Sequence, residues 1–175
     1  MDKNAPIIMT ALMGDADFAW ANRLRQQHFP PERNFLDAHI TLFHHLPPQM
    51  LPEIRQRVKD MVAVFAQPEA WLHDVMLQGK GVAYRLDCEG LMNIRDELAE
   101  NFAGMLTPQD QARPRLHITV QNKVTPAESK ALHEQLVAEF EPRPFAIKGI
   151  GLYYYRGGPW EEIGRYSFRG TQDAG

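Results

Sequence analysis

One short pattern occurs twice in this chain, and its repetition constrains the fold more than any other feature. The first motif is His39-Ile40-Thr41-Leu42, and the second motif, His117-Ile118-Thr119-Val120, follows 78 positions later in the 175-residue sequence. Alternate side chains of a β-strand point to the same face, so the histidine and threonine of each motif are predicted to face the same way. Two such strands, at similar depths in two halves of a chain, predict a duplicated unit that brings both histidines to one place.

The first half of the sequence predicts the order β-α-β-α-β over about residues 6–78. The predicted elements are a strand over 6–13, a helix over about 15–28, the first-motif strand, an amphipathic helix over 54–65 and a strand over 71–78. Asp15 or Asp17 is predicted to cap the first of these helices.

The second half predicts the same order over about residues 82–155. Its predicted elements are a strand over 82–88, a helix over about 91–103, the second-motif strand over 116–121, a helix that begins after Thr125 and a strand over 145–155. Thr125 and Glu128 have the spacing of a capping box. A last strand over about 160–169 forms a hairpin without a counterpart in the first half. We therefore expect one domain, residues 1–175, with two repeats.

Charge and cysteine content limit the function classes. The formal net charge is −3, whereas an extended nucleic-acid groove usually carries a basic excess, so no long duplex is expected as a partner. Cys88 is the only cysteine, which excludes an intrachain disulfide and favours a reducing compartment; we read it as a small structural hydrophobe. No apolar run reaches membrane-spanning length, so a cytoplasmic protein without membrane partners is expected.

Other phosphate and metal motifs are missing from the sequence. There is no glycine-rich Walker loop, and no cysteine or carboxylate set completes a zinc template around His44 and His45. Adjacent residues of a strand face opposite ways, so these two histidines are not predicted to share a metal. No cofactor is expected.

The paired motifs carry the groups that acid–base chemistry at phosphorus needs. Imidazole changes charge near neutral pH, so one histidine can accept a proton from the attacking group while the other protonates the leaving oxygen. Threonine hydroxyls can donate hydrogen bonds to phosphoryl oxygens without adding charge. A single histidine in a strand is more often packed than catalytic, but two copies in matching repeats favour function. Cleavage of a strained cyclic phosphodiester fits this set of groups best.

The two motifs resemble the paired His-x-Thr/Ser-hydrophobic signature of the two-histidine (2H) phosphoesterase superfamily, and the similarity extends over nearly the whole chain. That superfamily includes 2'-5' RNA ligase-like proteins, RNA 2',3'-cyclic phosphodiesterases and tRNA-splicing cyclic phosphodiesterases. The resemblance implies a bilobal α+β fold, with two antiparallel sheets lining a central cleft and helices outside. It also implies that His39 and His117 are the acid–base pair and that Thr41 and Thr119 hold the phosphate.

In the family pattern, the second-motif histidine activates water against a 2',3'-cyclic phosphate. The first-motif histidine then protonates the departing 3'-oxygen and leaves a 2'-phosphate. The implied substrate is an RNA terminus or a small cyclic nucleotide, and we expect the protein to act as a monomer. The same four residues would also serve a 2'-5' RNA ligase or a hydrolase of ADP-ribose 1'',2''-cyclic phosphate. A non-enzymatic module that binds nucleotides or RNA ends is the third alternative.

Four further residues are candidates for substrate contacts. Arg115 shares the predicted strand face of His117 and could neutralise phosphate, as could Arg33 from a loop; solvated surface arginines are the alternative for both. Tyr154 and Trp160 flank a glycine-containing turn and could stack on a base. Because alternate aromatic residues of a strand are usually core, only one or two aromatic side chains of this region are expected to contact ligand.

Overall fold

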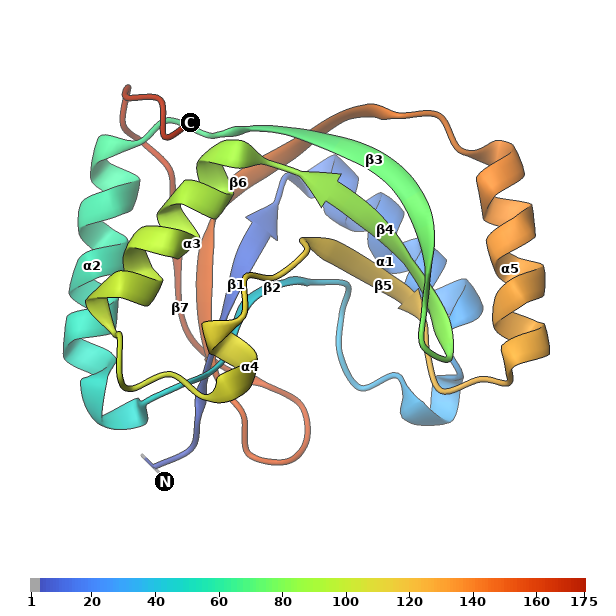
Figure 1. Ribbon diagram of the computed structural model, residues 1–175, viewed down its shortest axis with the longest axis horizontal. Coiled ribbons are helices and arrows are strands. Elements are labelled where there is room, and N and C mark those ends of the chain that lie inside the picture. Colours follow the sequence, from blue (N-terminus) through green and yellow to red (C-terminus); the bar gives the residue numbers. More distant parts are fainter. Residues whose placement is uncertain (1–3) are drawn as a thin grey trace.

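The α+β fold and the duplicated element order that the sequence predicts are present in the computed structural model, which describes residues 4–175 (Figure 1). The first half contains β1 (Ile7–Met13), α1 (Asp15–His28), β2 (Ile40–Leu46), α2 (Leu51–Val64) and β3 (Glu69–Gln78). The second half contains β4 (Gly81–Asp87), α3 (Glu89–Asn101), α4 (Pro108–Gln111), β5 (His117–Gln121), α5 (Pro126–Glu139), β6 (Arg143–Tyr154) and β7 (Glu161–Ser167). Two short 3₁₀ helices, Pro31–Arg33 and Pro48–Met50, flank the first motif.

The strands form one antiparallel sheet in the order β2-β1-β6-β3-β4-β5, with β7 added on β6. Strand β6 joins the two parts of the sheet, because Arg143–Ala146 pairs with β3 while residues from Ile147 to Tyr154 pair with β1. The two expected sheets are therefore continuous through this strand. Strands β2 and β5, which carry the motifs, are the two ends of the order, and the curved sheet brings them into contact. We call the region between these two strands the seam.

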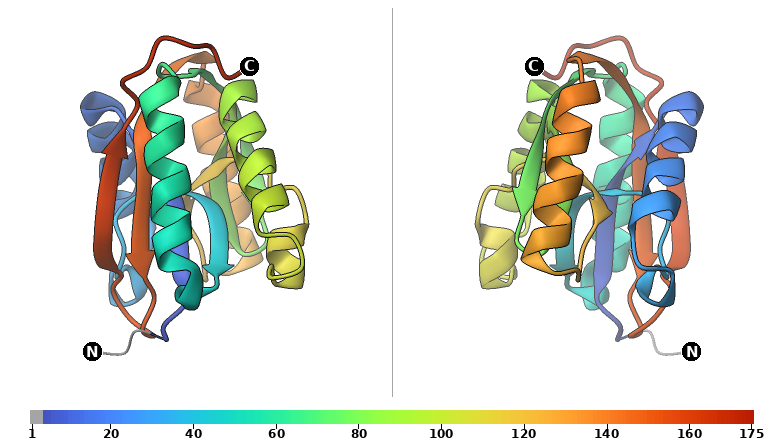
Figure 2. Two further views of the ribbon diagram at one scale, coloured as in Figure 1. Left: turned by 90° about the vertical axis from the view of Figure 1, so that its left-hand side faces the viewer. Right: turned by 90° about the vertical axis from the view of Figure 1, so that its right-hand side faces the viewer.

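The helices cover the outside of the curved sheet at its two ends. Helices α2 and α3 lie on one side of the molecule, and α1 and α5 lie on the other (Figures 1 and 2). Of the helices within residues 4–175, none has the length and apolar character needed to cross a membrane.

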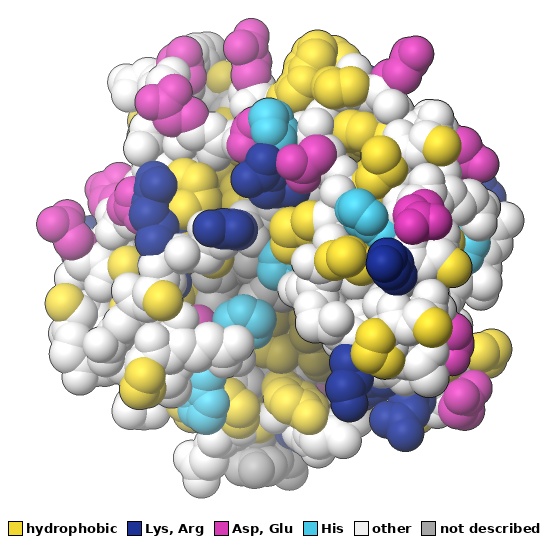
Figure 3. Space-filling view, turned by 45° about the vertical axis from the view of Figure 1, so that its right-hand side comes forward, with side chains coloured by type: hydrophobic (Ala, Val, Ile, Leu, Met, Phe, Trp, Pro, Cys, Tyr) yellow, Lys and Arg dark blue, Asp and Glu magenta, His cyan; other side chains and the backbone are white. Residues whose placement is uncertain are grey.

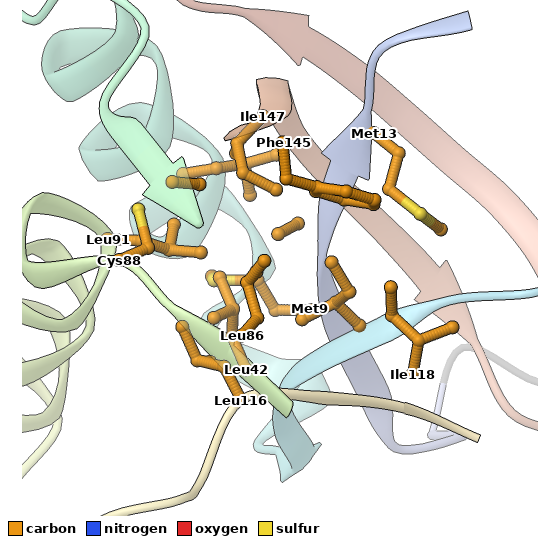
Figure 4. Packing of buried hydrophobic residues seen from close by; sticks show 14 of the residues in the cluster. Met9, Met13, Leu42, Leu86, Cys88, Leu91, Leu116, Ile118, Phe145 and Ile147 are labelled. Atoms are coloured by element: carbon orange, nitrogen blue, oxygen red, sulfur yellow. The ribbon is translucent and has the colours of Figure 1, made fainter. Parts of the chain in front are cut away.

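A single hydrophobic cluster fills the interior and draws on both halves of the chain. Figure 4 shows side chains from several strands converging, with Leu42 of β2 and Leu86 of β4 close to Met9 of β1. Ile118 of β5 and Leu91 of α3 belong to the same cluster. Burial of the apolar residues of each motif on this side anchors the strand and leaves the motif's polar residues on the other side.

Several local predictions are corrected by the structure. Asp15 and Asp17 do not cap α1, because Gly14 occupies the N-cap position. The Asp17 carboxylate instead accepts hydrogen bonds from the Arg143 side chain and the Ala146 backbone, so it ties α1 to β6. Cys88 lies at the N-cap of α3 rather than in the strand before it.

The capping box at α5 is confirmed. The Thr125 hydroxyl accepts a hydrogen bond from the backbone N–H of Glu128 and donates one to its carboxylate. The short helix α4 was not predicted, since it is a single turn beginning at a proline. It begins with a similar cap, in which the Thr107 hydroxyl accepts from the Asp110 backbone.

Candidate active site

Both motif histidines are oriented by the same local hydrogen bond. The Nδ1 atom of His39 lies 2.8 Å from the Asp37 carbonyl oxygen, and that of His117 lies 2.7 Å from the Arg115 carbonyl oxygen. A carbonyl can only accept, so Nδ1 is the protonated nitrogen of each neutral ring. The ring lone pair of each neutral histidine, which can accept a proton, is therefore on Nε2.

Burial strongly favours the neutral form of His39. The indole ring of Trp160 lies against the imidazole with a centroid separation of 4.7 Å and an interplanar angle of 59°. Desolvation is the main cause that lowers the pKa of His39 to about 4, and the charges of Arg25, His117 and His44 lower it further. The interaction between His39 and His117 reflects the approach of β2 and β5 across the seam.

Thr41 faces the same side of the sheet as His39 and is half-buried. It is paired with Thr10 across β1 and β2, and the Thr10 side chain is hydrogen-bonded to the Tyr153 hydroxyl. The Tyr153 ring reaches Thr10 by passing over Gly151, where a Cβ atom would come within 2.8 Å of the ring. Thr10 and Tyr153 thus form one wall beside the first motif.

Arg25 of α1 connects the second motif to the loop that precedes the first motif. Its guanidinium donates to the backbone oxygen of Thr119 at 3.1 Å and to the side-chain oxygen of Asn34 at 2.9 Å. Burial is the principal cause that lowers the pKa of Arg25 to about 10, so the group remains a cation at neutral pH. Sequence reasoning missed this residue, because an arginine within an amphipathic helix normally faces solvent.

Gln78 of β3 bridges the polar groups of the second motif. Its Nε2 atom lies 2.8 Å from His117 Nε2, and its Oε1 atom accepts a hydrogen bond from the Thr119 hydroxyl at 2.9 Å. Since His117 carries its proton on Nδ1, the Gln78 amide N–H donates to the Nε2 lone pair. No sequence pattern pointed to this residue, whose side chain reaches over β4 to β5.

Arg85 of β4 is directly paired with His117 and shares its face of the sheet. Its guanidinium donates to the Asp74 carboxylate at 2.8 Å, while its Nε atom is buried without a hydrogen-bond partner. The residue predicted to supply positive charge here, Arg115, contributes its carbonyl to His117 and has an exposed side chain. Arg85, rather than Arg115, therefore places a guanidinium group on the same face of the sheet as His117.

A β-bulge brings a third histidine to the seam side of β2. Met9 pairs with Phe43 while Thr10 pairs with Thr41, so one extra residue is inserted and the alternation changes. His44 then lies on the face of Thr41. The Asp110 carboxylate accepts from the successive backbone N–H groups of His44 and His45, each at 2.8 Å.

His44 is electrostatically linked to His117. Burial is the main cause that lowers the pKa of His44, and the charge of His117 lowers it further, whereas Asp110 opposes the shift. Strict alternation of side chains along β2 does not predict this position of His44, because it does not include the bulge. Within residues 4–175, no group of three or more His, Cys, Asp or Glu side chains is arranged to hold a metal ion.

A pocket of about 480 Å³ adjoins the first motif. Its lining includes His39, Trp160, Tyr153, Phe35, Lys148 and Arg165. The volume lies in the range of small-molecule sites, and the wall combines aromatic rings with two ion pairs, Lys148–Asp15 and Arg165–Glu162. Figure 3 shows a hollow in one face of the molecule, with hydrophobic side chains at its floor and His side chains beside it.

The remaining sequence candidates lie outside this pocket. Arg33 is exposed and lines a separate, more open pocket with Lys80 and Lys123. Tyr154 packs against the hydrophobic core, and the Arg156 guanidinium lies 4.8 Å from its ring centroid. Of the two aromatic candidates, only Trp160 adjoins a motif histidine.

Comparisons with known proteins agree on the family and the fold. A family model described as the 2'-5' RNA ligase superfamily matches residues 14–159. TT0787 of Thermus thermophilus is 16% identical with a TM-score of 0.66, covering 95% of this chain and 100% of that one. LigT of Escherichia coli, solved with 3'-AMP, is 18% identical with a TM-score of 0.59 over 96% and 99% of the two chains. No individually curated protein matches significantly.

Proposed function

The chain belongs to the 2'-5' RNA ligase superfamily, and from this membership we propose that it is a metal-independent phosphodiesterase. Its proposed substrate is a 2',3'-cyclic phosphate, at an RNA end or on a small nucleotide. The observation that carries the proposal is the matched orientation of His39 and His117. Each donates Nδ1–H to the carbonyl two residues before it, which leaves two Nε2 atoms for proton transfer.

In the proposed reaction, His117 Nε2 accepts a proton from a water molecule as that water attacks phosphorus. The bond between phosphorus and the 3'-oxygen breaks, and His39 donates a proton to that oxygen. The product is a 2'-phosphate with a free 3'-hydroxyl. Thr41 and Thr119 donate hydrogen bonds to the phosphoryl oxygens, and Arg85 and Arg25 supply positive potential near them.

The acid role of His39 depends on the substrate's charge. A pKa of about 4 leaves the free imidazole neutral at pH 7. An anionic phosphate beside the ring stabilises the imidazolium and raises the pKa, so the acid would be charged by substrate binding. The enzyme would therefore take up a proton when it binds its substrate.

The pocket beside His39 is the proposed place for the nucleoside. Its aromatic wall, which includes Trp160 and Phe35, suits stacking on a base. LigT of Escherichia coli, which has a similar fold, was solved with 3'-AMP and with phosphate, which supports a nucleotide ligand.

The family description favours a second candidate activity, 2'-5' RNA ligation. The same histidines could serve this reaction in the same roles, with a 5'-hydroxyl attacking the cyclic phosphate in place of water and the 3'-oxygen leaving as before. The two activities are distinguished by adding an RNA with a 5'-hydroxyl and analysing the products. Hydrolysis gives a 2'-phosphate, whereas ligation gives a longer RNA.

The test is turnover of nucleoside 2',3'-cyclic phosphates and of short RNAs with cyclic ends, in the presence of EDTA. ADP-ribose 1'',2''-cyclic phosphate belongs in the same panel. We expect hydrolysis to a 2'-phosphate that EDTA does not inhibit. Tight binding of every substrate with no product after long incubation would contradict an enzymatic function and favour a binding module.

A further inference from the structure

The side chain of Gln78 engages the two reactive groups of the second motif at once. Its amide N–H donates to His117 Nε2 at 2.8 Å, and its carbonyl oxygen accepts from the Thr119 hydroxyl at 2.9 Å. A neutral imidazole has one ring lone pair and a hydroxyl has one proton. Both reactive sites are therefore fully used by Gln78 in the unliganded protein.

This occupation conflicts with turnover by the proposed mechanism. His117 cannot take a proton from water while its Nε2 lone pair accepts from Gln78. Thr119 likewise cannot donate to a phosphoryl oxygen while its proton is directed at the amide carbonyl. Both hydrogen bonds must break before the reaction proceeds.

We propose that Gln78 is a positioning residue that occupies the reaction site of the second motif and is displaced when a substrate phosphate enters. The proposal rests on the function proposed above, because it assigns the same roles to His117 and Thr119. Gln78 Oε1 marks the place of a phosphoryl oxygen, which also accepts from Thr119. Gln78 Nε2 marks the place of the attacking water, which also donates to His117.

The local fold makes such a placement accessible. Gln78 is the last residue of β3, and its neighbour Gly79 has a positive φ of 55° in the turn to β4. Its side chain crosses β4 near Gly81, with which Gln78 is paired, and Ala83, which is paired with Thr119. A Cβ atom at Gly81 would overlap the Gln121 backbone, so glycine is required for the close approach of β5.

Holding the site in this way prepares it for the reaction. The donated hydrogen bond favours the tautomer of the neutral His117 ring that carries its proton on Nδ1 and its lone pair on Nε2. The accepted hydrogen bond points the Thr119 proton toward the place that the phosphate would fill. Gln78 also competes with the substrate and weakens its binding, because the substrate must replace two internal hydrogen bonds.

The experiment compares Gln78→Ala and Gln78→Met with the wild-type protein. Both variants remove the amide, and methionine retains most of the side-chain volume. Binding of inorganic phosphate is measured by titration calorimetry, and kcat and KM are measured with a nucleoside 2',3'-cyclic phosphate. Gln56→Ala is the matched control, because Gln56 is an exposed glutamine of α2 whose amide donates to the neighbouring Asp60.

We expect both Gln78 variants to bind phosphate about 5-fold more tightly or better, since each net hydrogen bond is worth roughly that factor. KM should fall by a similar factor and kcat should fall by less than about 10-fold, while Gln56→Ala behaves as wild type. A merely structural role would not lower Kd and KM together.

Unchanged or weaker phosphate binding in both variants would overturn the proposal, even if the wild-type protein hydrolyses cyclic phosphates. Conversely, tighter phosphate binding in the variants with no turnover by any form would support Gln78 as the occupant and reject the proposed hydrolase. The two failures are therefore distinguishable.

Discussion

The Trp160 indole packs against the His39 imidazole, with ring centroids 4.7 Å apart. The Tyr153 ring also lies against this indole, at a centroid distance of 5.6 Å and an interplanar angle of 44°. The C-terminal hairpin, which has no equivalent in the first half, thereby shields the first-motif histidine from water. Desolvation is the main cause of the low pKa of His39, and we expect the hairpin to contribute to it.

Trp160→Ala should raise the pKa of His39 from about 4 toward the ordinary value near 6.5, because the ring regains contact with water. The measurement is an NMR titration of the imidazole protons. Trp71→Ala, which removes an exposed tryptophan of β3, is the control and should leave His39 unchanged. A His39 pKa that stays near 4 in Trp160→Ala would show that other groups desolvate the ring.

Anion binding should be coupled to proton uptake at His39. Sulfate is a suitable probe, because it does not itself titrate between pH 5 and 7. The bound anion raises the pKa of His39, so affinity should strengthen as pH falls from 7 toward 5, by at most about 10-fold per pH unit for one proton. Calorimetry in buffers of different ionisation enthalpy measures the uptake. His39→Gln should take up fewer protons on binding sulfate than the wild-type protein does. Equal proton uptake by the variant and the wild type would contradict His39 as the group that is protonated.

Asp110 should be important for stability although it lies outside the reaction site. Its buried carboxylate accepts the backbone N–H groups of His44 and His45 at the β2 bulge. Asp110→Ala should lower the free energy of unfolding by about 2–4 kcal/mol, measured by urea denaturation. Asp96→Ala, which breaks an exposed ion pair with Arg113, should cost less than about 1 kcal/mol. Equal losses in the two variants would refute the role of Asp110.

Cys88 should be unreactive in the folded protein. Burial raises the pKa of its thiol to about 11, so very little thiolate is present at pH 8. A thiol reagent should label it slowly under native conditions and rapidly in urea. Fast labelling of the native protein would place Cys88 in a more open environment.

Local sequence patterns were sufficient to predict the elements that place the motifs. The strand and helix periods located β1, β2, α2, β5 and α5, and the duplication implied that the two motif strands correspond. Predictions failed where tertiary contacts decide the outcome. The Asp17 carboxylate, for example, accepts a hydrogen bond from the backbone of β6 rather than capping α1.

The residues around the motifs were hidden from sequence analysis for the same reason. Gln78 reaches the second motif across β4, and Arg25 reaches it from α1, so neither has a fixed spacing from His117. His44 faces the seam only because of a bulge, which period-2 alternation does not reveal. Such contacts depend on register and strand order, which the sequence pattern alone left open.

The most direct test of two-histidine catalysis is hydrolysis of a nucleoside 2',3'-cyclic phosphate by His39→Ala and by His117→Ala, measured in EDTA. His133→Ala is the matched control, because that histidine lies on α5 and contacts the backbone oxygen of Val75. We predict that each motif substitution lowers kcat/KM by at least about 10²-fold while the control retains activity. Full activity in both motif variants would contradict the assignment of His39 and His117 as the acid–base pair.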